Sequence, residues 1–260
     1  MSIRAPAVAG MFYPGDPAAL DRAVRGYLAD AAVRGPAPKA MILPHAGYPY
    51  SGPVAASGYA RLAEVRDTVT RVVLLGPAHR VPVSGLAVST AQSFATPLGT
   101  VPVDRESVER ILALPQVTAF DAAHRLEHSL EVHLPFLQEA LAAFALVPLV
   151  VGDATTEEVA EVIESLWGGP ETLILVSSDL SHYYDYDTAR TLDTATSAAI
   201  EALNPDAIAD HQACGRIPVK GLLRAARDHG LTAETIDLRS SGDTAGPRGE
   251  VVGYGAYVFG

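Results

Sequence analysis

Short, continuous apolar runs alternate along the chain with segments in which apolar residues recur every three or four positions. Four runs are rich in β-branched residues and occupy residues 39–43, 70–76, 145–152 and 172–178. Such runs are typical of strands that are buried on both faces of a mostly parallel sheet. Helical spacing follows or precedes them, at residues 15–33, 104–114, 155–167, 186–204 and 218–230.

Residues that favour the start or the end of a helix flank these segments. Asp16 precedes Pro17 at the start of the first helical segment, and Gly230 ends the last one,. Residues 250–260 alternate in the manner of a closing strand, which we expect to be antiparallel. Because strands and helices alternate over the whole length, the sequence predicts one α/β domain spanning 1–260. Its single open, mostly parallel sheet carries helices on both faces.

Composition narrows the class of protein. The 260 residues are 48% hydrophobic and 19% charged, with a formal net charge of -11. This composition is globular, and the negative charge argues against a nucleic-acid or anionic membrane partner. No apolar run approaches the ~20 residues of a membrane helix, and the first residues lack the pattern of a signal peptide. The single cysteine, Cys214, excludes an internal disulfide and a multi-cysteine zinc site. We therefore expect a soluble cytoplasmic protein.

Polar side chains gather where the apolar runs end. His45, His79 and the pair Asp179 and His182 each follow one run. In open α/β sheets ligands bind outside the carboxyl ends of the strands, so three histidines there predict a shared site. Two neutral imidazoles are a common start of a transition-metal site, which needs a further ligand. Cys214 is a candidate because it precedes a helical segment, although a lone cysteine is more often a small buried hydrophobe.

A second polar cluster is "HRLEHSLEVHLPF", in which His124, Glu127, His128 and Glu131 fall on one face of an expected helix,. Its first five residues, "HRLEH", match the H-x-x-E-H pattern of some zinc peptidases, so a zinc hydrolase remains an alternative. We favour a helix face on which Glu127 and His128 support a neighbouring pocket. Tyr48 and Tyr50 flank His45 and either line a substrate pocket or cover the strand ends.

Together these segments resemble the Memo family, whose bacterial and archaeal branch is also called AmmeMemoRadiSam system protein B. The likeness runs in family order over essentially the whole chain. The matching segments are "PAVAGMFYPGD", "LPHAGYPYSGPVAASGYA", "LLGPAHR", "FATPLGTVPVD", "EHSLEVHLPFLQ", "SSDLSHY", "ACGRIP" and "VVGYGAY".

The resemblance implies an α/β fold similar to the LigB-type class III extradiol dioxygenases, which are non-heme iron enzymes. It implies metal ligation by His45, His79 and Cys214, and an acid/base role for His182, which we expect Asp179 to orient. The dioxygenases use two histidines and a carboxylate, whereas the family pattern contains a thiolate. A softer thiolate suits iron, copper(I) or zinc, and ring cleavage is not inherited from the fold alone.

Three hypotheses follow. The first is a mononuclear oxidoreductase, with Fe(II) preferred over copper or zinc, that acts on an unknown small molecule. The second is a non-catalytic metal- or partner-binding protein associated with a radical S-adenosylmethionine enzyme and an AMMECR-type protein. The third is the zinc hydrolase built on "HRLEH". The sequence names neither the substrate nor the oligomeric state.

Overall fold

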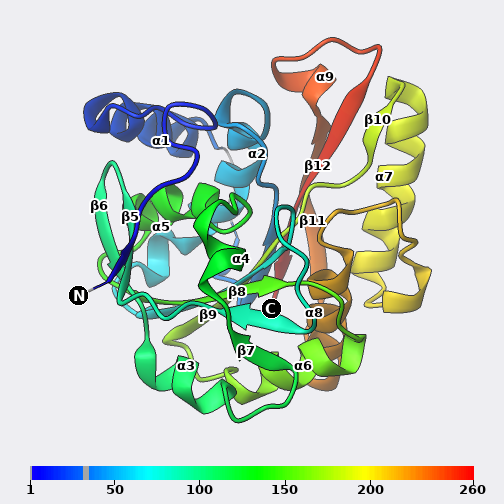
Figure 1. Cartoon of the computed structure of the whole chain (residues 1–260). Coiled ribbons are helices and arrows are strands. Elements are labelled where there is room, and N and C mark those ends of the chain that lie inside the picture. The colour runs from blue at the N-terminus through cyan, green and yellow to red at the C-terminus, as the bar shows by residue number, and fades with distance from the viewer. Residues whose placement is uncertain (1, 32–34) are drawn as a thin grey trace.

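A mixed sheet of nine strands forms the centre of the computed structural model, which describes residues 2–31 and 35–260 (Figure 1). Eight strands follow one another across the sheet, and the ninth, β11 (Ala233–Ser240), pairs with β12 alone. The spatial order is β10 (His182–Tyr184), β12 (Val251–Phe259), β2 (Ala40–Leu43), β9 (Thr172–Ser177), β3 (Arg71–Pro77), β8 (Ala145–Val151), β4 (Leu86–Val88) and β7 (Val117–Ala119).

The four apolar runs form the predicted parallel core of this sheet. β2, β9, β3 and β8 are parallel neighbours, and nearly all of their residues are buried. β12 lies antiparallel to β2, as the alternating tail predicted. The fold class is therefore confirmed, with β4, β10 and β11 adding further antiparallel pairings. Because the core strands run the same way, their carboxyl ends share one edge of the sheet.

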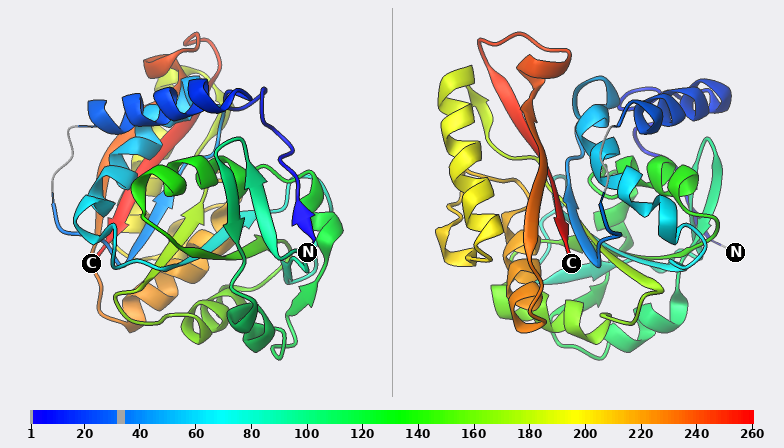
Figure 2. Two further views of the ribbon diagram at one scale, coloured as in Figure 1. Left: turned by 90° about the vertical axis from the view of Figure 1, so that its left-hand side faces the viewer. Right: turned by 180° about the vertical axis from the view of Figure 1, so that it is seen from behind.

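Helices cover both faces of the sheet (Figure 2). On one face α2 (Tyr48–Tyr59) packs against β2 and β12, with α1 (Pro17–Asp30) and α5 (Leu134–Ala140) beside it. The opposite face carries α6 (Thr156–Ser165) and α8 (Arg216–Asp228), while α7 (Tyr186–Glu201) packs along β11 and β12. Among the described residues, none of the helices combines the length and apolar character needed to cross a membrane.

Local capping explains where several helices begin and end. Asp16 accepts the backbone N–H of Ala19 at the start of α1, and Thr155 and Glu158 form a capping box at α6,. Gly230 follows α8 with φ +68°, a conformation that glycine adopts without strain,. The predicted first helix extended to residue 33, and residues 32 and 33 lie outside the described part of the chain. The shorter helical elements are α3 (Arg105–Ile111), η1 (Ala60–Val65), η3 (Pro205–Ala207) and α9 (Ser241–Thr244).

The expected helix over "HRLEH" is wrong. α4 (Asp121–Arg125) ends before Glu127, and the next helical turn is η2 (Glu131–His133). The carboxylate of Glu127 accepts the backbone N–H groups of His128 and Ser129, both at 2.9 Å. Because these two N–H groups bind the carboxylate, they do not form the backbone hydrogen bonds of a helix, and the segment forms a turn.

A small sheet and a buried ion pair tie the start of the chain to this turning segment. β1 (Ile3–Arg4) pairs with β5 (Ser93–Thr96), which pairs with β6 (Gly99–Pro102). The Arg4 guanidinium donates to the buried Glu131 carboxylate, to the Glu127 carbonyl at 2.6 Å and to the His124 carbonyl at 3.0 Å. The N-terminal segment therefore fixes the backbone on either side of Glu127.

Candidate metal centre

Three histidines converge beyond the carboxyl ends of the core strands. Potential ligand atoms of His45, His79 and His128 all lie within 4.8 Å of one another. His45 follows β2, His79 follows β3, and His128 belongs to the segment between α4 and η2. The ring centroids of His45 and His79 are 5.2 Å apart, and those of His79 and His128 are 4.6 Å apart. This three-histidine group could bind one metal ion.

The Ser177 hydroxyl determines which nitrogen of His45 is available. Ser177 Oγ donates its only proton to the carbonyl of Ser129 at 2.6 Å, because a carbonyl can only accept,. The hydroxyl must then accept from His45 Nδ1 at 2.6 Å and from His133 Nε2 at 2.9 Å. Neutral His45 consequently keeps its lone pair on Nε2, the nitrogen that lies 3.5 Å from Cys214 Sγ.

His133 extends this hydrogen-bonded chain away from the centre. With its proton on Nε2, the ring accepts from the Tyr59 hydroxyl at Nδ1, over 2.7 Å. Both residues are fully buried, and burial lowers the pKa of His133 to about 3. The ring therefore stays neutral, with its proton on Nε2, and continues to donate to the Ser177 hydroxyl.

Glu127 performs the equivalent task for His79. One carboxylate oxygen accepts from His79 Nδ1 at 2.9 Å, and the other accepts the backbone N–H of His79 at 2.6 Å. Burial opposes the ionisation of Glu127, but these bonds and the backbone N–H of Ser129 together lower its pKa to about 2. A permanent carboxylate keeps the His79 proton on Nδ1 and leaves Nε2 as a lone pair.

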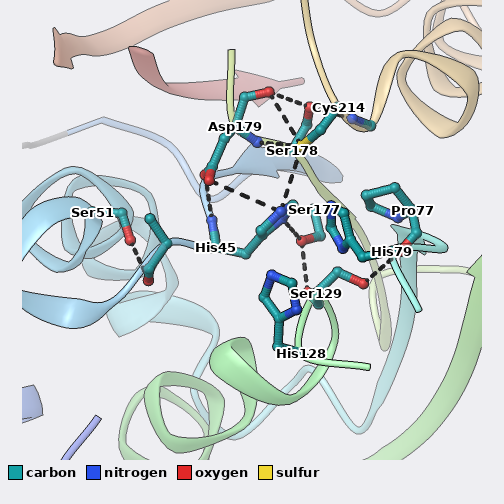
Figure 3. Close-up of polar contacts among 12 residues, drawn as sticks. His45, Ser51, Pro77, His79, His128, Ser129, Ser177, Ser178, Asp179 and Cys214 are labelled. Carbon is teal, nitrogen blue, oxygen red and sulfur yellow. Dashed lines mark hydrogen bonds and ion pairs between the residues drawn. The ribbon is translucent and has the colours of Figure 1, made fainter. Parts of the chain in front are cut away.

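Cys214 and Asp179 lie on the other side of His45 from His128 (Figure 3). Asp179 donates its backbone N–H to Cys214 Sγ at 3.3 Å, and its side chain accepts the backbone N–H of His45 at 2.8 Å. Burial raises the pKa of Cys214 to about 12, and the neighbouring Asp179 adds to the shift. Burial raises the pKa of Asp179 to about 6. Cys214 is outside the three-histidine group but touches its most buried member.

The remaining candidate residues, His182, Tyr48 and Tyr50, differ in their contacts and in their exposure to solvent. His182 begins β10, and its Nδ1 donates to the carbonyl of Leu180 at 2.8 Å. Tyr48 is buried in the core and donates its hydroxyl to the Val132 carbonyl at 2.8 Å. Tyr50, also in the first turn of α2, is exposed. The ring of His182 is thus held by a carbonyl, while the carboxylate of Asp179 contacts His45.

Solvent reaches the centre from the side of His79. The side chain of His79 is 27% exposed, against 13% for His128 and 2% for His45. A cavity of about 350 Å³ adjoins Cys214 and is lined also by Pro77, Asp153 and Arg216. Solvent therefore contacts the His79 side chain directly, and a small molecule in this cavity would lie against Cys214.

Sequence reasoning placed His45 and His79 at the strand ends but gave His128 a supporting position. It did not single out Ser177 or His133, both of which bind the ring network directly. Ser177 is the second-last residue of the run 172–178, so its position near the end of the strand was visible. Its bonding partners were not, because they come from a segment more than 40 residues away.

The site can be set beside known proteins. A family model described as "Memo-like protein" matches residues 4–258. A MEMO1 family protein of Aquifex aeolicus is 35% identical, with 100% of each chain covered. One from Archaeoglobus fulgidus is 37% identical, with 99% of each chain covered. The crystal structure of an uncharacterized Escherichia coli K12 protein matches with a TM-score of 0.53. Its sequence identity is 14%, and the match covers 84% of this chain and 98% of that one. The last match supports the fold alone.

Proposed function

Because the chain belongs to the Memo family, we propose that it is a mononuclear Fe(II) protein that oxidises a small molecule with O2 as the oxidant. The ion would be held by His45, His79 and Cys214, with His128 close enough to add a third imidazole. The single observation that carries this proposal is the convergence of unprotonated ring nitrogens beyond the strand ends.

The donor atoms fit a transition metal. Imidazole nitrogen and thiolate sulfur suit iron, copper or zinc, whereas magnesium and calcium prefer oxygen. Zinc lies about 2.1 Å from nitrogen ligands and about 2.3 Å from sulfur ligands, so a nitrogen and a sulfur atom that share such an ion are at most about 4.4 Å apart. The separation of His45 Nε2 and Cys214 Sγ is 3.5 Å. The pair thus needs little movement to share one ion, which supports Cys214 as a ligand.

The protein's own groups supply the remaining chemistry. When bound, Fe(II) provides Lewis-acid and redox chemistry. His182 keeps its proton on Nδ1 through the Leu180 carbonyl, so Nε2 is the atom that would take a proton from the substrate,. Asp179 holds the backbone of His45 and so fixes the direction of its ring. His79, at the exposed side, lies where the substrate would enter.

One feature favours a second candidate, a metal-binding protein without turnover. The extradiol dioxygenases, to which the family resemblance implies a similar fold, use a carboxylate ligand, whereas the group beside His45 Nε2 here is a thiol. Such a protein would act through partners, for which a radical S-adenosylmethionine enzyme and an AMMECR-type protein are our proposal. A pull-down with the wild-type chain and with His45→Ala would test whether binding of those partners depends on the centre.

Anaerobic iron loading followed by oxygen-uptake measurements with a panel of catechols tests the first candidate. We expect one equivalent of Fe(II) per chain and substrate-dependent oxygen consumption that His182→Gln abolishes. Stoichiometric metal without oxygen uptake would favour the second candidate. Unchanged iron binding in His45→Ala would contradict both.

A further inference from the structure

A second cavity lies away from the metal centre, between the N-terminal segment and α4. Its volume is about 720 Å³, within the range of small-molecule sites and about twice that of the cavity at Cys214,. One wall is formed by residues 2–7, and the other by residues 89–91, 121, 122 and 124–126. Ile3 and Leu126 on these walls are each 55% exposed.

The walls are mainly apolar, and most of their polar groups are already paired. The Asp121 carboxylate accepts from the hydroxyl of Ser89 and from the backbone N–H of Thr90. The Arg4 guanidinium is directed to Glu131 and to two carbonyls. These groups therefore offer little bonding capacity to a ligand.

His124 is the exception. Only 2% of this residue is exposed, and its Nε2 donates to the Ala87 carbonyl at 3.0 Å. Nδ1 must then be an acceptor, and it has no hydrogen-bond partner within the described residues. Burial, reinforced by Arg4, lowers the pKa of His124 to about 4, although its bond to the Ala87 carbonyl and nearby Asp121 and Glu127 oppose the shift. His124 is one of the residues that line the cavity, and its Nδ1 is covered by neighbouring atoms, so a ligand's donor would reach it through a small shift of side chains. Such a bond is favourable because leaving a buried acceptor unpaired costs free energy.

Arg125 supplies a positive charge at the same cavity. It is exposed and takes part in no ion pair among the residues that the structure describes, in a chain whose net charge is -11. A ligand with a negatively charged group would find this cation beside the apolar walls. The charge and the unpaired acceptor thus belong to adjacent residues.

We propose that this cavity binds a small amphipathic anion with an apolar body and one N–H or O–H donor. The donor bonds to His124 Nδ1, the body packs against Ile3 and Leu126, and the anionic group is attracted to Arg125. The site is separate from the metal centre, because none of its lining residues belongs to the histidine group or contains the thiol.

The dye 8-anilinonaphthalene-1-sulfonate carries all three features, since it has aromatic rings, one N–H and one sulfonate. Titrated into the full chain at pH 7, it is expected to bind saturably at one site. Leu126→Glu and Arg125→Glu should each weaken binding, the first by about tenfold through loss of apolar contact. Leu238→Glu is the matched control, because Leu238 is 37% exposed and lines a different cavity.

The N–H donor can be tested separately with the N-methylated dye. Losing one hydrogen bond should weaken binding to the wild type by roughly three- to tenfold. His124→Phe should bind both dyes equally, because it lacks the acceptor. Unsaturable binding, equal binding by Leu126→Glu and wild type, or a greater loss in Leu238→Glu or His45→Ala would overturn the proposal. Circular dichroism of each variant distinguishes a lost site from a lost fold.

Discussion

The hydroxyl oxygen of Ser177 lies 2.6 Å from Nδ1 of His45, at the end of the central strand β9. The same oxygen binds His133 Nε2 and the Ser129 carbonyl. One hydroxyl therefore joins the most buried imidazole of the centre to a segment distant in sequence, and leaves Nε2 as the ring nitrogen that could bind a metal ion.

Ser177→Ala should weaken metal binding by about 10- to 100-fold, the range seen when a group that orients a ligand is lost. The fold should remain, since the change removes one oxygen. Calorimetric titration with Zn²⁺ or Co²⁺ measures the effect. Ser197→Ala, at another buried serine that bonds Tyr257, serves as the control and should bind metal as the wild type does. Equal affinity in the two variants would argue against an orienting role.

Glu127→Gln should lower the stability of the fold and also weaken the hydrogen bonds that orient the His79 ring. The carboxylate accepts four N–H groups, and an amide NH₂ in place of one oxygen would face donors,. We expect a loss of about 1–3 kcal/mol in the free energy of unfolding. Urea denaturation measures it, with Glu109→Gln on an exposed position of α3 as the control. A loss no larger than the control's would mean that the carboxylate is dispensable.

Arg4→Ala should be more damaging than the removal of an exposed arginine. It leaves the Glu131 carboxylate buried, with its remaining partners the Ala7 and Val8 N–H groups and the Tyr13 hydroxyl. Breaking such a buried pair typically costs about 3–5 kcal/mol. Arg25→Ala removes the ion pairs of an exposed arginine with Asp21 and Glu139 and should cost much less, because ion pairs of exposed side chains contribute little,. Thermal denaturation of both variants should show the difference, and similar melting temperatures would refute it.

His133 should make stability depend on pH. Burial lowers its pKa to about 3, whereas the unfolded chain titrates near ~6.5, so the unfolded state binds more protons between these values,. The free energy of unfolding should therefore fall as pH decreases from about 6.5, by up to about 1.4 kcal/mol per pH unit. Asp179, with its pKa raised to about 6 by burial, gives the opposite slope between about pH 4 and 6.

Comparison of the wild type with His133→Gln isolates this contribution, because the Asp179 term is common to both. Glutamine keeps a donor and an acceptor but does not titrate. Denaturant midpoints at pH 7, 6 and 5 should converge as the pH falls. Parallel curves would show that His133 is not held neutral in the folded chain.

The sequence predicted the parts of this molecule that local patterns determine. The runs at 39–43 and 172–178 became neighbouring parallel strands, so His45 and Asp179 at their ends had to meet. His79 follows β3, which pairs with β9. Cys214 was one candidate ligand until resemblance to the Memo family singled it out, and no spacing rule supplied its position beside His45.

Tertiary contacts decided what the sequence did not reveal. "HRLEH" has helical spacing, but the Glu127 carboxylate satisfies the N–H groups that a helix would have used, and His128 turns toward His79. β11 was also missed, because its exposed and half-buried residues lack a strict alternation. The bond between Ser177 and His133 depends on how two distant segments pack.

A crystal structure of the metal-loaded chain, with anomalous scattering at the absorption edges of iron and zinc, tests the central claim most directly. We predict one peak within about 2.4 Å of both His45 Nε2 and His79 Nε2, with Cys214 Sγ or His128 completing the set. A peak at His124 and Glu127, or none after loading with stoichiometric metal, would contradict it.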